Sequence, residues 1–278
     1  MVTTIAIMGA GGYMGLQSAR QLKDNPDYRA LHVEVSDEGR KRLSEMGLST
    51  TSQGEALSQA DVVLLAVPDR LIASIARDIV PAVRSGAMIM GLDPAAAHAG
   101  VLPRRDDISY FVTHPCHPPM FGDETEPEAQ QDFVGSDKAK QAVVCALHQG
   151  PEADYARGEA IARVILAPVL RVHRVTTEQM ATLEPALAET IAYTFVYAMK
   201  EAMDEAVRRG IPEPVARDFL LGHLRCGVGE VFLWDGSTIS EGCKRAVAEA
   251  QKQMFQPDWM KVMRPESIKE SVRNIVQA

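Results

Sequence analysis

Residues 3–15 read Thr-Thr-Ile-Ala-Ile-Met-Gly-Ala-Gly-Gly-Tyr-Met-Gly, and this stretch predicts how the first half of the chain folds. Its first six residues are apolar or β-branched and predict a buried strand, and residues 15–23 have a helical pattern. The glycines allow a tight turn and close approach of a pyrophosphate, to which the helix N-terminus offers free N–H groups. A simple strand-to-helix turn is the alternative, but the strand before and the helix after favour a dinucleotide site. The expected cofactor contacts are Gly9, Gly11, Gly12, Tyr13, Met14 and Gly15.

Strand and helix patterns alternate beyond this turn and predict an α/β domain. Amphipathic helices are expected at 38–46 and 71–83, between apolar runs. This alternation is typical of a Rossmann-type, doubly wound parallel sheet. A further strand, helix and strand fit residues 141–175. The remaining apolar runs lie at residues 30–35, 62–67, 87–92 and 108–113.

Strand signals stop after Thr176, and the rest of the chain predicts helices only. A long helix is expected over 178–209, kinked at Pro185 because proline lacks a backbone N–H. The prediction is therefore two domains, a dinucleotide-binding domain at 1–175 and an all-helical domain at 176–278. The further expected helices are 213–234, 240–253 and 265–276.

Acidic side chains at the end of the second apolar run predict which cofactor binds. Glu34 follows the glycine turn at the distance where a carboxylate reads the ribose hydroxyls, and it would repel a 2′-phosphate. NAD is therefore expected rather than NADP. Asp37 is the competing candidate, and Arg40 could soften the preference. Pro68 and Asp69, which follow another apolar run, are expected to contact the cofactor without taking part in chemistry.

The overall charge argues against several classes of partner. The 278 residues carry 29 basic and 37 acidic side chains, a net charge of −8, and only 5% are aromatic. Nucleic acids and anionic membranes need a basic face, so neither is expected as a partner. No run reaches the roughly 18 apolar residues that span a bilayer.

The four cysteines form no C-x-x-C pair, which predicts a reduced, cytoplasmic protein.

Residues 113–119, Thr-His-Pro-Cys-His-Pro-Pro, follow the apolar run at 108–113. Two histidines and a cysteine at this spacing could bind metal, and the prolines hold the backbone rigid. A histidine at the carboxyl end of a strand could also take the proton of a substrate hydroxyl as hydride leaves its carbon. The alternative is a proline-rich turn in which the histidines only make hydrogen bonds.

Four residues of the helical half are further candidates for binding a metal ion or the substrate. Glu184 and Glu189 lie in an apolar stretch, where carboxylates are costly to bury unless they are paired or bind metal. One solvated and one salt-bridged glutamate is the structural alternative. His223 and Arg225 could hold a substrate carboxylate, or could equally pack at a subunit interface.

The glycine motif, the turn at 67–69 and the helical second half resemble the 6-phosphogluconate dehydrogenase and β-hydroxyacid dehydrogenase superfamily. Residues 113–119 are similar to the His-Pro-Met-Phe-Gly motif of prephenate dehydrogenases, where the histidine contacts the hydroxyl being oxidised; that position is His114 here. The inserted Cys-His-Pro-Pro displaces Met120-Phe121-Gly122. A closer resemblance, over nearly the full length, is to the D-apionate oxidoisomerase family. It rests on the glycine motif, on residues 113–119 and on the Phe-x-Asp-Glu continuation at 121–124.

This resemblance implies NAD-dependent oxidation of a branched sugar acid, D-apionate, and an acyl shift to a 3-oxo acid, 3-oxo-isoapionate. A divalent ion such as Zn²⁺ or Mg²⁺ would polarise the two oxygens involved. We expect His117 and Glu184 to bind it, with Glu189 as a third candidate ligand or a catalytic residue, and His114 to be the acid/base. The resemblance also implies a homodimer. A plain hydroxyacid dehydrogenase and a non-catalytic NAD(H) sensor are the alternatives.

Overall fold

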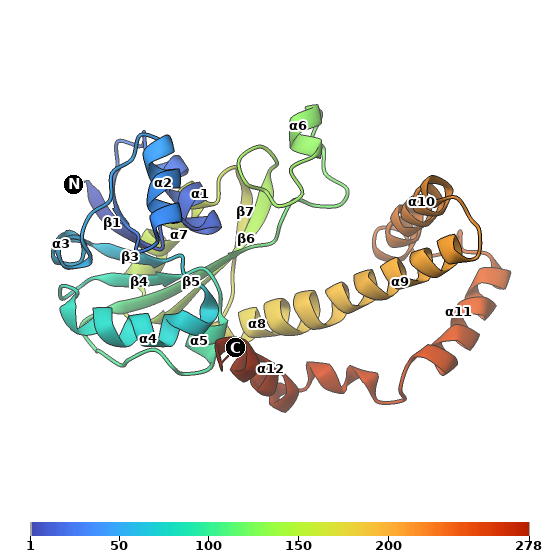
Figure 1. Cartoon of the computed structure of the whole chain (residues 1–278). Coiled ribbons are helices and arrows are strands. Elements are labelled where there is room, and N and C mark those ends of the chain that lie inside the picture. Colours follow the sequence, from blue (N-terminus) through green and yellow to red (C-terminus); the bar gives the residue numbers. More distant parts are fainter. Residues whose placement is uncertain (1, 278) are drawn as a thin grey trace. The chain divides into compact units, whose positions relative to one another are not determined.

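The computed structural model describes residues 2–277. The chain forms two compact units (Figure 1). The first contains the chain up to Pro185 and again from Ile268 onward, and the second is Ala186–Ser267. The C-terminal helix thus belongs to the first unit, which the sequence pattern did not indicate.

A seven-stranded sheet with the strand order β2-β1-β3-β4-β5-β6-β7 is the centre of the first unit. The predicted α/β architecture with a dominantly parallel sheet is confirmed. β1 to β5 pair in parallel, whereas β6 is antiparallel to β5 and β7 is parallel to β6. β6 reverses direction because the connection at 116–140 begins and ends at the same sheet edge. The strands are β1 (Thr3–Met8), β2 (Tyr28–Val33), β3 (Val62–Leu65), β4 (Met88–Gly91), β5 (Ser109–Pro115), β6 (Gln141–Gln149) and β7 (Val169–Arg174).

Helices cover both faces of this sheet (Figure 1). Successive side chains of β1 point to opposite faces, so Ile5 and Ile7 join one core cluster and Ala6 and Met8 join the other. The first cluster packs under α1 (Tyr13–Leu22), α2 (Asp37–Glu45) and α7 (Ala153–Ile165). The second packs against α3 (Gln53–Gln59), α4 (Asp69–Ile79) and α5 (Ala95–His98). A short helix, α6 (Pro127–Gln130), lies in the connection between β5 and β6.

The helix predicted to kink at Pro185 is instead built in three parts. α8 (Thr177–Ala181) starts with a capping box between Thr176 and Gln179. It continues as a π-helical segment, Thr182–Tyr193, that contains Pro185, and then as α9 (Thr194–Arg208). The wider π turns accommodate the proline, which has no N–H to donate and whose ring would crowd the preceding turn of an α-helix.

The second unit is helical, as the sequence predicted. It contains α9, α10 (Glu213–Phe232) and α11 (Glu241–Met254), followed by a 3₁₀ turn at Trp259–Met263. α12 (Pro265–Gln277) buries Ile268 and Val272 in the first unit. No helix among residues 2–277 is long and apolar enough to cross a membrane.

One glycine of the first unit is required by packing. A Cβ at Gly158 on α7 would lie 2.3 Å from the buried Phe111 ring, whereas one at Gly54 on α3 would meet nothing within 4 Å. We therefore predict that Gly158→Ala lowers the free energy of unfolding by about 1–3 kcal/mol. Gly54→Ala is the matched control and should raise it by about 0.5–1 kcal/mol. Urea denaturation measures both, and equal midpoints for the two variants would contradict the packing argument.

Candidate active site

The glycine turn is closed by contacts that leave no room for side chains. Gly9 has φ +76°, and a Cβ there would lie 2.5 Å from the Ala66 carbonyl oxygen. A Cβ at Gly15 would lie 2.2 Å from the Gly9 oxygen, and one at Gly11 would lie 2.4 Å from Gly39 of α2. Gly12 is the N-cap of α1, and Tyr13 and Met14 form its first turn. The N–H groups of residues 9–12 donate to Val33, Glu34 and Gly9, so the first turn of α1 is the part that can offer N–H groups to an anion. It lies at the carboxyl edge of β1, where an open α/β sheet binds its ligand.

Glu34 folds back over the glycine turn. Its Oε2 accepts a hydrogen bond of 2.8 Å from Gly11 N, and its Oε1 accepts from Val35 N and from the N–H and hydroxyl of Ser36, each at 2.9 Å. Burial would raise the pKa of Glu34, but these hydrogen bonds outweigh it and hold the pKa below its ordinary value. The predicted ribose reader is thus an anion beside the glycine turn. Asp37, the competing candidate, starts α2 and has a fully exposed carboxylate.

Pro68 and Asp69 follow β3, the strand next to β1, and lie at its carboxyl edge. Pro68 is the N-cap of α4 and Asp69 is its first residue. Burial raises the pKa of Asp69, with a smaller upward contribution from the charge of Glu184 and a downward one from His114. Asp69 therefore lies within electrostatic reach of His114 and Glu184 as well as beside the predicted cofactor turn.

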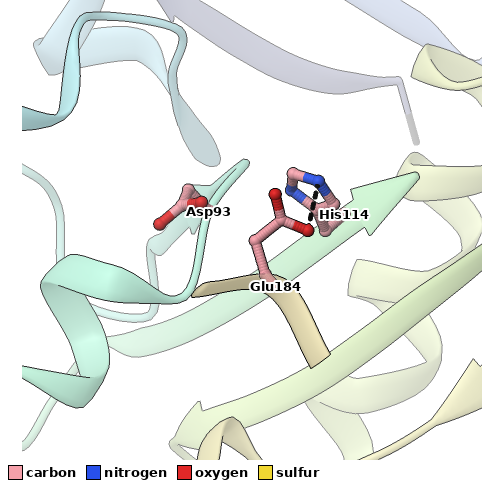
Figure 2. A group of neighbouring side chains, drawn as sticks. All are labelled: Asp93, His114 and Glu184. Carbon is pink, nitrogen blue, oxygen red and sulfur yellow. Dashed lines mark ion pairs between the residues drawn. The ribbon is translucent and has the colours of Figure 1, made fainter. Parts of the chain in front are cut away.

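His114, near the end of β5, has its tautomer set by the backbone. Its Nδ1 lies 2.8 Å from the carbonyl oxygen of Leu92, which can only accept, so Nδ1 carries a proton. Its Nε2 lies 3.0 Å from Oε2 of Glu184 (Figure 2). In the neutral ring, this nitrogen would direct a lone pair at a carboxylate. The contact is therefore favourable only when a cation, either a proton or a metal ion, lies between them.

The shifts of the two pKa values agree with that requirement. Burial would lower the pKa of His114, but the hydrogen bond and charge of Glu184 outweigh it and raise the pKa. Burial would raise the pKa of Glu184, but His114 and, more weakly, His117 lower it. Both side chains are mostly buried, at 18% and 19% exposed. Glu184 comes from the π-helical segment, a conformation that is frequent at functional sites.

Asp93 is a site residue that the sequence reasoning missed. It follows β4 by two residues, and its Oδ1 accepts a 2.6 Å hydrogen bond from Ala95 N at the start of α5. Burial, together with the charges of Asp69 and Glu184, raises the pKa of Asp93 to about 6. The signal that could have found it is its place after an apolar strand, the same rule that selected Pro68 and Asp69.

Asp93, His114 and Glu184 form a group that could hold a metal ion (Figure 2). One ligand atom from each lies within 4.8 Å of the others. Two carboxylate oxygens and one imidazole nitrogen are a donor set that suits a divalent cation. The three residues come from the turn after β4, from β5 and from the π-helical segment, and all belong to the first unit.

His117 lies close to this group but outside it. Its ring centre is 6.3 Å from that of His114, and its Nδ1 lies 2.9 Å from the carbonyl oxygen of Val134. Because that oxygen only accepts, the neutral ring keeps its proton on Nδ1 and has an unprotonated Nε2. His117 is exposed and has φ +60°, the left-handed conformation that non-glycine residues rarely adopt.

The remaining predicted site residues lie in the second unit. Glu189 lies in the π-helical segment, and His223 and Arg225 lie on α10; all three are exposed. His223 stacks on Phe219, with ring centres 4.1 Å apart, and its Nδ1 lies 2.8 Å from the Phe219 carbonyl oxygen. Their expected roles toward substrate stay predictions.

Two family models cover the chain. Residues 122–276 match the model described as phosphogluconate dehydrogenase (decarboxylating), C-terminal. Residues 2–121 match the NADPH-binding domain of acetohydroxy acid isomeroreductase. A structure of an NADH-preferring ketol-acid reductoisomerase from an uncultured archaeon shares the fold, with a TM-score of 0.68 at 17% identity over 99% of this chain and 82% of that one.

Closer relatives match from end to end. D-apionate oxidoisomerase from Cupriavidus necator is 50% identical over 99% of this chain and 100% of its own length, and that from Rhizobium rhizogenes is 48% identical over the same shares. A solved structure, described as a semialdehyde dehydrogenase NAD-binding protein from Cupriavidus necator in complex with calcium and NAD, has a TM-score of 0.95 at 50% identity. It aligns over 99% of this chain and 100% of that one. The chain therefore belongs to the D-apionate oxidoisomerase family, within the 6-phosphogluconate dehydrogenase-like superfamily.

Proposed function

We propose that this chain is an NAD-dependent oxidoreductase that oxidises the C2 hydroxyl of D-apionate and rearranges the carbon skeleton to 3-oxo-isoapionate. The observation that carries this proposal is the end-to-end match, at 50% identity, to a relative named D-apionate oxidoisomerase. The cluster of Asp93, His114 and Glu184 at the carboxyl edge supports it, because a rearrangement of this kind needs two neighbouring oxygens to be held and polarised together.

NAD is the proposed cofactor. NAD, when bound, supplies the hydride acceptor. Its pyrophosphate would lie against Gly9, Gly11 and Gly12, which leave room for it, and the N–H groups at the start of α1 would hold it. The anionic Glu34 beside the turn would accept the ribose hydroxyls and repel a 2′-phosphate. The Cupriavidus necator structure at 50% identity was solved with NAD, which supports this choice.

The geometry favours an exchange of roles between the two histidines. The sequence-based expectation assigned the metal to His117 and Glu184 and the proton transfer to His114. Because Nε2 of His114 faces the Glu184 carboxylate, we assign the metal to Asp93, His114 and Glu184. A divalent metal at this site would act as a Lewis acid and a template for the two substrate oxygens. The calcium in the Cupriavidus necator structure supports a divalent cation in this family.

His117 is then the proposed acid/base. Its Nδ1 is held by Val134, so its Nε2 is free to take the proton of the C2 hydroxyl as hydride leaves C2. In the rearrangement, the tertiary C3 oxygen becomes the new carbonyl while a hydroxymethyl group moves from C3 to C2. Once the exposed His117 has released the first proton to solvent, the same nitrogen would take the proton of the C3 hydroxyl and return it to the C2 oxygen. The migrating group is hydroxymethyl rather than acyl, because it must leave the carbon that bears the tertiary oxygen.

His223 and Arg225 are the proposed contacts of the substrate carboxylate, since an imidazolium or a guanidinium can bind a carboxylate by charge-assisted hydrogen bonds. Glu189 stays a proposed second catalytic carboxylate. A cytoplasmic role in sugar acid catabolism is the proposed setting, in keeping with oxidation of a sugar acid by NAD and with the sequence-based expectation of a reduced protein.

We also propose that the helical unit forms a homodimer. Among its described residues, the buried hydrophobic side chains are Met203 and Ala216, together with Ala186 at its first position. Many large apolar side chains of this unit are exposed, more than a monomer ordinarily leaves in contact with water. They include Val196, Tyr197, Phe219, Leu221, Val231, Phe232, Leu233 and Trp234.

The first prediction of this proposal concerns the product. With D-apionate and NAD, the enzyme should form NADH in proportion to a product whose ¹³C NMR spectrum contains two inequivalent hydroxymethyl carbons, one of them bonded to the ketone, whereas the two are equivalent in the unrearranged 2-oxo acid. Unbranched sugar acids should give little NADH and no rearranged carbon. An unrearranged 2-oxo acid would instead indicate a plain dehydrogenase, and tight NADH binding without turnover of any sugar acid would indicate a sensor.

The second prediction separates the two histidines. Glu184→Gln and His114→Gln should weaken metal binding at least tenfold, because each removes a ligand. His117→Gln should keep the metal and lose about 10²- to 10⁴-fold in kcat, the usual contribution of a general acid/base. Metal content by plasma mass spectrometry and steady-state kinetics provide the two readouts. If His117→Gln loses the metal while His114→Gln retains it, the roles are those expected from the sequence.

The third prediction concerns the oligomer. Light scattering should give twice the 30.3 kDa chain mass. Phe232→Asp, at a side chain that is 78% exposed on α10, should shift the protein toward a monomer. Val2→Asp changes an exposed apolar residue of the first unit and should leave the mass unchanged. A monomeric wild-type peak at micromolar concentration would refute the proposed dimer.

A further inference from the structure

The carboxylate of Asp132 organises the loop at residues 132–139, in the connection between β5 and β6. Its Oδ1 accepts hydrogen bonds from Gly135 N at 3.0 Å and from the N–H and hydroxyl of Ser136 at 2.9 and 3.0 Å. Its Oδ2 accepts from the next three backbone N–H groups, those of Asp137, Lys138 and Ala139, at 3.0–3.2 Å. One side chain thus replaces the backbone partners that a regular element would provide for this segment.

These hydrogen bonds also determine the charge of Asp132. Burial would raise its pKa, but the backbone donors outweigh burial and hold the pKa well below its ordinary value. The side chain is therefore an anion at neutral pH. Asparagine, which is nearly the same size, would place an NH₂ group against some of these donors and could not accept from all of them.

Three side chains outside the loop fix it to the rest of the first unit. The Gly135 carbonyl accepts from Gln141 Nε2 at 2.8 Å and from Gln17 Nε2 at 3.3 Å. Gly135 has φ +76°, and a Cβ there would lie 2.6 Å from the Gln141 amide. Asp137 pairs with Arg20 at 3.4 Å. Gln17 and Arg20 are both on α1, the helix that starts at the glycine turn. These contacts therefore hold the loop against α1.

Val134 lies inside this loop, and its carbonyl oxygen is the partner of His117 Nδ1. The three residues after Val134 are held by Asp132, and the Gly135 carbonyl is held by Gln17 and Gln141. The orientation of the Val134 carbonyl therefore depends on the Asp132 carboxylate. His117 is otherwise exposed and in a left-handed backbone conformation, so this hydrogen bond is what fixes its ring.

We propose that Asp132 is a positioning residue, which holds the Val134 carbonyl so that the neutral His117 ring carries its proton on Nδ1 and presents a basic Nε2. The functional part of this inference rests on the proposed role of His117 as acid/base. The structural part, a dependence of the His117 tautomer on Asp132, stands without it. Asp132 touches none of the reacting groups and acts through Val134 and His117.

The test is a long-range ¹H–¹⁵N correlation spectrum of ¹⁵N-histidine-labelled full-length protein, with the His117 signals assigned by their loss in His117→Gln. In the wild type, Nδ1 of neutral His117 should have the shift of a protonated nitrogen and Nε2 that of an unprotonated one. In Asp132→Asn, the two shifts should move toward the average of a mixed tautomer population. Glu126→Gln, which removes an exposed carboxylate at the N-cap of α6 in the same connection, should leave them unchanged.

Kinetics provide the second readout. Asp132→Asn should lower kcat about 10- to 100-fold with D-apionate, since a displaced catalytic group costs this much, while NAD affinity stays within about twofold. Failure of the proposed function would appear as absence of wild-type turnover, and the tautomer measurement would still decide the role of Asp132. An unchanged His117 tautomer in folded Asp132→Asn would overturn the inference, as would an unchanged kcat if the wild type turns over.

Circular dichroism and NAD affinity establish whether Asp132→Asn is folded. If it is not, Ser136→Ala removes only the hydroxyl bond to Oδ1 and keeps the backbone donors. It should move the His117 shifts in the same direction by a smaller amount. A His117 tautomer that is identical in Ser136→Ala and wild type would then overturn the proposal.

Discussion

The parallel pairing of β1, β3, β4 and β5 is the constraint on which the candidate site depends. In the observed register, Met8, Leu65, Gly91 and Val112 lie side by side across the sheet. The residues that follow these four positions consequently emerge at one edge. They include the glycine turn, Pro68 and Asp69, Asp93, and His114. No local sequence signal brings these groups together, since it is the shared direction of the strands that does so.

Backbone carbonyls fix the same tautomer in His114 and His117, to which we assign different roles. His114 and His117 each donate from Nδ1 to a main-chain oxygen, that of Leu92 and that of Val134. Both neutral rings therefore have an unprotonated Nε2. Nε2 of His114 meets the Glu184 carboxylate and requires a cation there, whereas His117 lies outside the metal-competent group. The same residue type can thus serve as a ligand at one position and as a base at the other.

The parts of the fold that could be predicted are those whose signals are local. The strands and the glycine turn follow from apolar runs and from the glycines, and each appears where the sequence indicated. The reversed direction of β6 and the return of α12 to the first unit depend on packing partners far along the chain. At Pro185 the pattern predicted a kink, but the chain forms π turns, because proline excludes the regular helix without dictating which alternative replaces it.

Local sequence is enough to predict the glycine turn, the acidic residue after β2 and the rigid histidine–proline segment. Each depends on the steric and hydrogen-bonding properties of neighbouring residues. The contacts of Asp93 with His114 and Glu184, and of His117 with Val134 in the loop organised by Asp132, appear only in the folded chain. These contacts join segments that are distant in the chain, and side-chain type and spacing carry no information about which distant carbonyl or carboxylate a histidine will meet.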